Sequence, residues 1–401
     1  MDLNRLTQAV ADDAAIRRLC RLQPAGGPGD KIFPPTYPGE GSNAPPRHVF
    51  ETRRIDGEDV RCVLIDSVQS QANRLEEALL AAHRAGRIRL PLIEVDFTGC
   101  QAHEEDLSDL GVITSLDAPH RVFDAILRDS EFDGAEFMRS RVGRQLQKAN
   151  MRSATALFEV SPTALLFGAW NSTGEGGGLG AKFPRCLVSE IVGIGVAEGK
   201  RTGSRIDPLG VRDVPVFRLP NGRWTLDRQE AGARPRQERP SEINHGNIRP
   251  TVQDLGVTID WALHTSVISL AGLRRLSFPA DGRSSDDTRD NAARTVLAAM
   301  ALVALSEQDR AGYALRSRCD LVPEGRAPFE LVHADGRSEP FELSADAAIS
   351  LFDDAVQQAE GHGLPWRTDP IRLTPLPRLV ELVALSRQKA LAGEAEPDET
   401  D

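Results

Sequence analysis

One stretch, from Val60 to Leu75, constrains this chain more than any other part of its sequence. Residues 60–65 form a short apolar run rich in β-branched side chains, and Leu75, Leu79 and Leu80 then recur at helical spacing. Because the period changes within a few residues, we predict a strand that turns directly into a helix. The turn carries a dense set of polar side chains: Asp66, Ser67, Gln69, Ser70, Gln71, Asn73 and Arg74.

The first turn of this helix is a potential anion site. Ser67 or Ser70 can cap it, and the backbone N–H groups at a helix start are unpaired and carry partial positive charge. Gln69, Asn73 and Arg74 add neutral donors and one cation. A phosphate could bind there. The alternative is that the serines are only caps and the amides are solvated, which is more common at an isolated turn.

Length and composition bound the class of protein. With 401 residues, the chain is long enough for two or three domains. Its five cysteines are scattered and never form CxxC, which argues against a disulfide framework or a thiolate zinc site. The sequence starts without an apolar leader and contains no apolar run of membrane-spanning length, so we expect a cytoplasmic protein.

The net charge of −11 argues, taken whole, against a nucleic-acid partner. The charge is unevenly distributed, however. Residues 139–218 hold 12 Lys and Arg against 6 Asp and Glu, so this segment carries +6 while the rest of the chain carries −17. The acidic end, residues 393–401, is expected to be disordered. A polyanion could therefore bind the central segment.

Periodicity and breakers give the order of elements. The proline-rich segment 31–39 is expected to be extended. Residues 198–208 are expected to form a long basic hairpin tip, and residues 220–250 a connection without regular structure. Helices are expected at 5–22, 117–130, 134–149, 266–276, 289–306, 344–360 and 376–392, and strands at 93–97, 187–196, 211–219, 251–264 and, as the last strand, 313–322. With the strand and helix at 60–85, this order resembles an elaborated ferredoxin-like sheet.

Enzyme motifs are poorly represented. Residues 193–199 have one residue too many for GxGxxG, residues 195–200 are one short of a Walker A loop, and HExxH and GxSxG are absent. His245 is the best single candidate for acid or base catalysis, and Asp66 and Asp207 could serve metal-assisted phosphodiester cleavage. Nothing in their spacing pairs them.

Three separated loops favour nucleic-acid binding. Residues 67–74, 171–185 and 198–212 are each rich in the Ser, Asn, Gln, Lys, Arg and Gly that contact phosphate and 2′-hydroxyl groups. The second includes the glycine run 174–180. Aromatic residues are only 5% and no RNP1 motif is present, so base stacking across an RRM sheet is not supported. Binding would be largely independent of sequence.

Several long blocks of the chain resemble the RAMP-superfamily, Cas-seven type backbone subunit of type I-U (I-G) CRISPR interference complexes. The likeness spans about residues 31–322. The blocks are Val63–Glu76, Ala118–Asp129, Phe167–Gly174, Ser189–Gly193, Ser204–Pro208, Ser241–Asn247 and Leu315–Asp320.

This resemblance implies an α+β fold with an RRM-like palm, inserted fingers and thumb, and a helical C-terminal extension. The implied division is an N-terminal helix and proline-rich arm at 1–45, a palm at 46–322 with fingers at about 86–186 and a thumb at about 219–250, and C-terminal helices with the acidic tail at 323–401. Copies of such a subunit line up along a CRISPR RNA, beside other subunits, so that the guide pairs with target DNA. Neither catalysis, a metal nor a cofactor is implied.

RNA binding is carried over to the motif residues. They are Ser67, Gln69, Ser70, Asn73, Arg74, Lys182 and Arg185, followed by Arg201, Ser204, Arg205, His245 and Asn247. Two alternatives stay open. One is a metal-dependent RAMP ribonuclease that uses Asp66, Asp207 or His245, and the other is a scaffold whose proline-rich arm and acidic tail bind proteins only.

Overall fold

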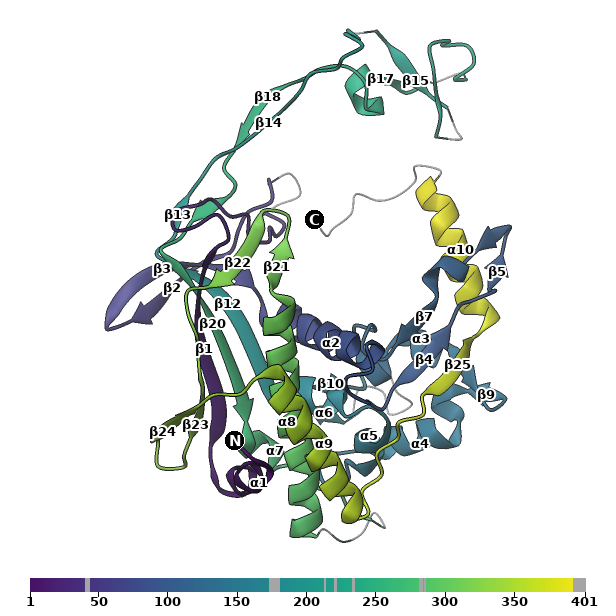
Figure 1. The fold of residues 1–401 in the computed structure, drawn as a ribbon. Helices are drawn as coiled ribbons and strands as arrows, with labels where there is room; N and C mark the ends of the chain where they lie inside the picture. Colours follow the sequence, from purple (N-terminus) through teal and green to yellow (C-terminus); the bar gives the residue numbers. More distant parts are fainter. Residues whose placement is uncertain are drawn as a thin grey trace.

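The computed structural model describes residues 1–39, 44–172, 181–212, 214–219, 222–232, 235–280, 284 and 286–391 (Figure 1). Within these residues, nine strands form one antiparallel sheet. Along the sheet the order is β2 (Phe50–Ile55), β3 (Glu58–Asp66), β12 (Leu187–Ile194), β20 (Trp261–Ser269), β1 (Ala15–Pro24), β22 (Cys319–Pro323) and β21 (Tyr313–Arg316). In addition, β23 (Phe329–Val332) pairs with β1, and β24 (Ser338–Phe341) pairs with β23.

Helices cover one face of this sheet. Alternate residues of β20, from Ala262 to Ile268, are buried, while those between them are half-buried. The buried face carries α2 (Val68–Arg84) and α8 (Asp287–Ala311), which pack on each other. Most side chains of α8 are buried, because alanines let neighbouring elements pack all around it. Around α8 lie α1 (Leu3–Asp12), α7 (Leu270–Leu273) and α9 (Ala345–Gly361).

A smaller sheet forms a second layer of structure beside the first. Its order is β7 (Val112–Thr114), β4 (Ile93–Asp96), β25 (Ile371–Pro375), β8 (Ser130–Phe132) and β9 (Ala135–Glu136). The C-terminal strand β25 pairs in parallel with β4 and antiparallel with β8. Around this sheet lie β5 (Gln101–Ala102), β6 (Glu105–Asp106), η1 (Ser108–Leu110), η2 (Arg121–Phe123), α3 (Ala125–Arg128), η3 (Phe137–Arg139), α4 (Arg141–Lys148) and α10 (Pro377–Leu391). After α5 (Thr155–Val160), α6 (Thr163–Phe167) contacts α8 and β12 of the main sheet.

A long arm projects from the main sheet (Figure 1). Its base is the pair β13 (Ala197–Glu198) and β19 (Val257–Thr258), and its stem is the pair β14 (Arg201–Arg205) and β18 (Ile248–Gln253). The tip contains β15 (Val216–Arg218), β16 (Trp224–Thr225), β17 (Gln237–Glu238) and η4 (Pro240–Ile243). Inside the tip, the buried carboxylate of Glu238 accepts hydrogen bonds from Arg218 at 2.8 and 3.1 Å.

The mixed α+β class and several elements are confirmed. The strand at 60–65 and its helix are β3 and α2, and the helices expected at 289–306, 344–360 and 376–392 are α8, α9 and α10. The strands at 93–97 and 187–196 are β4 and β12. None of the helices in the described ranges is long and apolar enough to cross a membrane.

Other expectations were wrong. The helix at 5–22 ends at Asp12, and the following residues form β1. The helix at 266–276 is reduced to α7, because β20 continues to Ser269. Residues 198–208 are no hairpin tip: β14 pairs with β18 across the arm, and residues 220–250 contain strands. The C-terminal region is not only helical, since β23, β24 and β25 follow the expected last strand.

Two sequence features lie outside the described residues. They are the glycine run at 174–180 and the acidic tail at 393–401.

Candidate nucleic-acid interface

The strand-to-helix turn is built around Asp66. Ser67 caps α2 by accepting a hydrogen bond from the Ser70 backbone N–H at 3.2 Å. Both carboxylate oxygens of the buried Asp66 are occupied: Oδ1 accepts from Ser70 Oγ at 2.7 Å, and Oδ2 accepts from Gln71 Nε2 at 2.6 Å. Ser67 and Ser70 therefore stabilise the helix start, which leaves Asp66 saturated by internal donors.

Arg74 closes the same cluster. Its Nε donates to Asp66 Oδ2 at 3.0 Å, and its Nη2 donates to the Leu315 carbonyl at 2.5 Å. The side chain is 27% exposed, so part of it reaches the surface. Gln69 and Asn73 are exposed on the first turns of α2. The turn thus presents two amides and the edge of one guanidinium to solvent.

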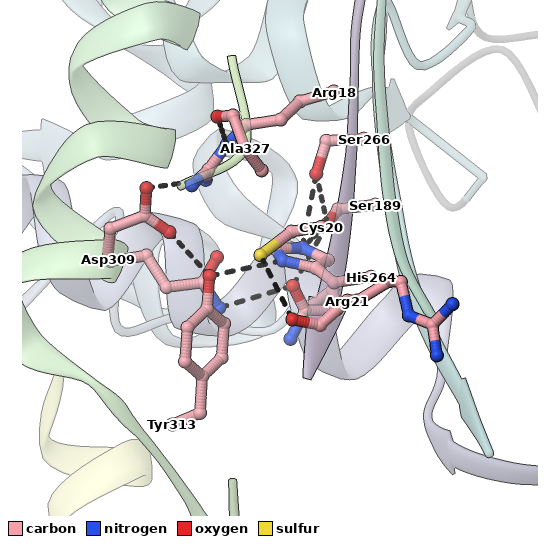
Figure 2. A network of polar contacts seen from close by, with 11 residues as sticks. Arg18, Cys20, Arg21, Ser189, His264, Ser266, Asp309, Tyr313 and Ala327 are labelled. Atoms are coloured by element: carbon pink, nitrogen blue, oxygen red, sulfur yellow. Dashed lines mark hydrogen bonds and ion pairs between the residues drawn. The ribbon is translucent and has the colours of Figure 1, made fainter. Parts of the chain in front are cut away.

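A buried polar network joins α2 to the sheet, and Figure 2 shows its members Ser189, His264, Tyr313 and Asp309. Gln71 Oε1 accepts from Ser189 Oγ on β12 at 2.9 Å, and Ser189 lies 2.7 Å from His264 Nε2 on β20. His264 Nδ1 is 3.2 Å from the Tyr313 hydroxyl, which itself donates to Asp309 on α8. Such a network fixes one register of helix against sheet.

A second anchor of α2 is the buried ion pair between Glu76 and Arg121. Arg121 Nε and Nη2 donate to the two carboxylate oxygens at 2.6 and 2.7 Å. Arg121 Nη1 also donates to the Gly168 carbonyl at 3.1 Å. Gly168 has φ +85°, and a Cβ there would lie 3.0 Å from the Phe183 carbonyl oxygen, so glycine is required. The pair ties α2 to the start of the next strand.

That strand, β10 (Ala169–Trp170), pairs with β11 (Lys182–Phe183). Trp170 is 50% exposed, and Lys182 Nζ lies 4.0 Å from the centre of its indole ring. A flat aromatic face beside an ammonium group is suited to contact with a nucleobase and a phosphate. Lys182 is therefore an exposed cation on a fixed support.

Arg185 has a different environment. Its Nε donates to the Phe167 carbonyl at 3.1 Å, and the side chain lies near Glu76 and Arg121. Burial, with repulsion from Arg121 as a second cause, lowers the pKa of Arg185. The structure gives this residue a role in holding the β10–β11 pair. Direct contact with RNA stays a prediction.

The other predicted residues lie on the arm, separate from the α2 group. Arg205 Nη2 donates to the carbonyls of Asn244 and Gly246, and Asn247 Oδ1 accepts from the Asp207 N–H at 2.7 Å. Backbone N–H donors at Leu209 and Gly246 lower the pKa of Asp207. These contacts hold the arm's turn together.

The remaining three predicted arm residues are Arg201, Ser204 and His245. Arg201 and Ser204 are exposed on β14, and the His245 ring packs edge to face with Trp224, with 6.1 Å between ring centres. Of the predicted arm residues, Arg201, Ser204 and Asn247 are exposed, and His245 is half-buried.

The open face of the main sheet is poorly suited to bind phosphates. Its arginines are neutralised by glutamates, with Arg17 on Glu330 at 2.5 Å, Arg21 on Glu324 at 2.9 Å and Arg53 on Glu190 at 2.7 Å. Among the described residues, no group of three or more His, Cys, Asp or Glu side chains could hold a metal ion. Among the predicted site residues, the cations with accessible side chains are Arg74 on α2, Lys182 on β11 and Arg201 on the arm.

Sequence reasoning missed Trp170 and the Glu76–Arg121 pair. Trp170 belongs to the block Phe167–Gly174, and an exposed tryptophan in a recognisable motif was a usable signal. Glu76 and Arg121 are 45 residues apart and carry no pattern that would pair them.

The structure separates the effects of two neighbouring cations. We expect Lys182→Ala to weaken RNA binding and to lower the magnitude of the salt slope by about one unit, because one phosphate contact is lost. We expect Arg185→Ala to act mainly by loosening the β10–β11 pair. Affinity measured across a salt series, with thermal unfolding of both variants, checks this. If the salt dependence of RNA affinity were the same for Lys182→Ala and the wild type, Lys182 would not contact the RNA.

Comparison with known proteins gives two matches. Residues 16–198 match the family described as CRISPR-associated protein GSU0053. Among solved structures, the chain is similar to the crystal structure of Thermofilum pendens Csc2, with 8% sequence identity and a TM-score of 0.26, over 96% of this chain and 79% of that chain. No curated protein matches the chain.

The matched segment contains β1, β3, α2 and β12, and the blocks from Val63 to Gly193 lie within it. The match therefore covers the polar turn and these strands, and it is to a CRISPR-associated family. Residues 16–198 are thus similar to the GSU0053 family, and over this segment the resemblance to CRISPR-associated proteins inferred from the blocks is confirmed. The blocks from Ser204 onward lie outside the matched residues.

Proposed function

We propose that this chain is a CRISPR RNA-binding backbone subunit of a type I-U (I-G) interference complex. Several copies bind along one guide RNA and hold it for pairing with target DNA, beside other subunits of the complex. The observation that carries the proposal is the family match over residues 16–198, which includes the polar turn at the start of α2.

The strand order supports an RRM-like palm. Four strands lie in the order β22, β1, β20 and β12, all antiparallel, which is the order 4-1-3-2 of a ferredoxin-like unit. Helix α2 comes between the first and second of these strands in the chain, and α8 comes between the third and fourth. On this assignment, the hairpin β2–β3 is an addition at one edge.

The accessible polar groups support an RNA path beside α2. Gln69 and Asn73 are exposed there, and the Glu76–Arg121 pair ties the same helix to the support of Trp170 and Lys182. Contacts of these kinds reach phosphate, ribose and base faces without reading base edges. The arm takes the role of the thumb, which inserts between nucleotides or between neighbouring copies.

We further propose that the subunit binds RNA without cleaving it. The two Asp66 oxygens are occupied by Ser70, Gln71 and Arg74, and Asp207 accepts from backbone N–H groups. A metal-assisted nuclease needs carboxylate oxygens that are free to bind the ion. These contacts favour a structural role for both aspartates.

Co-purification tests the proposal. The chain is expressed with a CRISPR array, and the bound nucleic acid is separated on a denaturing gel. RNA of discrete length is expected. Absence of such RNA would contradict the proposal, and assembly that survives RNase treatment of the free subunit would favour the scaffold alternative. Shortening of bound RNA on addition of Mg²⁺ or Mn²⁺ would favour the ribonuclease.

A further inference from the structure

The direction of the arm is set where it joins the main sheet. Its stem strand β14 is exposed from Arg201 to Ser204, and among the described elements it packs mainly on its partner β18. A two-stranded ribbon of this kind is marginally stable alone and has little beside it to fix its direction. The residues between the base pair β13–β19 and the stem therefore decide where the arm points (Figure 1).

Two facing glycines occupy this junction. Gly199 follows β13 and Gly256 precedes β19, and the Gly199 N–H donates to the Gly256 carbonyl at 2.8 Å. Gly256 has φ +81°, a backbone conformation that other residues rarely adopt. Hinges turn on a few residues at the ends of elements, and small residues often serve there. The glycine pair is therefore the place where the arm can turn.

An extended strap, residues 31–35, lies across the glycine pair. A Cβ at Gly256 would lie 2.9 Å from the Phe33 ring and 3.0 Å from Lys31 Cδ. A Cβ at Gly199 would lie 3.3 Å from the same Lys31 carbon. The strap includes two consecutive prolines, whose rings fix φ and make it stiff. It therefore fills the space beside both glycines.

Backbone hydrogen bonds hold the strap on two sides. Ile32 and Val257 of β19 exchange two of them, each of 2.9 Å, and both side chains are buried in one apolar cluster. The Phe33 N–H donates to the Arg318 carbonyl at 3.0 Å, in the turn between β21 and β22. The strap thus joins the base of the arm to a part of the main sheet that is remote in sequence.

His48 fastens the end of the strap to the glycine pair. Its Nε2 accepts from the Gly256 N–H at 2.9 Å, and its Nδ1 lies 3.1 Å from the Pro35 carbonyl. Because the accepting nitrogen carries no proton, Nδ1 is the donor to Pro35. The ring is 5% exposed and packs edge to face with Phe50 of β2, with 6.3 Å between ring centres. One buried side chain therefore contacts the strap, the hinge glycine and the edge strand.

We propose that the arm turns on a hinge at Gly199 and Gly256, and that the strap holds this hinge closed with His48 as its fastening residue. His48 is a positioning residue, since it acts through the strap and the glycine pair. An arm with a preset direction loses less conformational freedom when it binds a partner. The inference goes beyond RNA binding and does not depend on it, so every test uses the full chain without RNA.

Distances between spin labels test the strap. Gln229→Cys on the arm and Ser386→Cys on α10 place labels at two exposed positions, in a chain with Cys100→Ser whose other four cysteines are buried. Double electron–electron resonance is expected to give a narrow distance distribution. His48→Ala in the same chain is expected to broaden it about twofold, as a freed hinge allows. A distribution that His48→Ala leaves unchanged, or that is already broad before the substitution, would overturn the proposal.

Two further variants separate fastening from a general effect. In His48→Gln, the side-chain amide supplies one donor for the Pro35 carbonyl and one acceptor for the Gly256 N–H, so a narrow distribution is expected again. His120→Ala removes an exposed histidine away from the arm and is also expected to leave the distribution narrow. Equal broadening in His48→Gln and His48→Ala would contradict fastening by these hydrogen bonds.

Lys31→Ala tests the strap without touching a buried side chain, and it decides the question if His48→Ala does not fold. It removes the bond from Lys31 Nζ to the Lys200 carbonyl, 2.8 Å long, and the side chain beside both glycines. Hydrogen exchange is expected to become about tenfold faster in peptides containing Gly199 and Gly256, with no change in β1 and β20. Unchanged exchange at the glycines, or faster exchange throughout the sheet, would contradict the proposal.

Discussion

Arg121→Ala is expected to lower the free energy of unfolding by about 3–5 kcal/mol, because it leaves the Glu76 carboxylate buried without its partner. The Arg121 side chain is 9% exposed and that of Glu76 is 3% exposed. Burial already raises the pKa of Glu76 to about 7 with the arginine in place. Chemical denaturation, followed by far-UV circular dichroism at pH 8, measures the loss.

Two comparisons make this result specific. Arg84→Ala removes an exposed arginine from the same helix, where it lies 3.6 Å from Asp117, and is expected to change stability by less than about 1 kcal/mol. The double variant Glu76→Leu, Arg121→Met removes both charges and is expected to recover much of the loss. If Arg121→Ala were as stable as Arg84→Ala, the pair would not be an anchor.

The same substitution connects stability to the interface. Arg121 also donates to the Gly168 carbonyl, directly before the strand that bears Trp170. Loss of that bond frees the β10–β11 pair relative to α2. The Lys182 and Trp170 side chains would then lose their fixed position beside the helix. The proposed RNA contacts of Trp170 and Lys182 therefore depend on the Glu76–Arg121 pair.

Local sequence patterns predicted the elements whose apolar residues face one way. The switch from β3 to α2 is an example, because a short apolar run rich in β-branched residues gives way to helical spacing after Asp66. Helix α8 was predicted from its long apolar run. The strand β20 was only partly predicted, since its buried positions include His264 and Ser266 while Leu263 and Val267 are half-buried. In the middle of this strand, polar side chains are buried and apolar side chains are half-buried, which is the opposite of what a hydrophobic pattern predicts.

Long-range pairing explains the other differences. Strand β25 inserts between β4 and β8, which lie more than 230 residues earlier in the chain. Nothing local in Ile371–Pro375 specifies that partner. Residues 198–208 were expected to form a hairpin with the strand that follows, yet β14 pairs with β18 and encloses the whole arm tip. Hydrogen-bonding partners of this kind are set by tertiary structure.

The candidate site was predicted in outline and changed in detail. The polar turn at the start of α2 is a cluster in the structure, as its density of serines and amides indicated. Which side chains point outward could not be predicted, because Asp66 holds Ser70 and Arg74 and the Ser67 hydroxyl caps the helix. Gln69 and Asn73 remain exposed. The buried aspartate thus decides which members of the motif can meet a ligand.

The polar network beneath that turn should make the protein sensitive to acid. Complete burial lowers the pKa of His264 to about 3, from 6.5. Between these values, the unfolded chain binds a proton at this histidine and the folded chain does not. Stability from this group is therefore fully present above pH 6.5 and falls as the pH is lowered towards 3. The loss between pH 6.5 and 4.5 is about 2–3 kcal/mol.

His264→Gln tests this origin. Glutamine offers one donor and one acceptor to Tyr313 and Ser189 but does not titrate. The variant is expected to be less stable than the wild type at pH 7, because the ring contacts are lost, and to lose about 2–3 kcal/mol less on acidification. Denaturation at pH 7.0 and 4.5 measures both, with His103→Gln, in an exposed turn, as the control. Equal acid losses in all three proteins would assign the acid sensitivity to the carboxylates instead. A reduced loss only in His264→Gln would show that the network joining Gln71 on α2 to β12 and β20 holds the proposed interface in place through a neutral histidine.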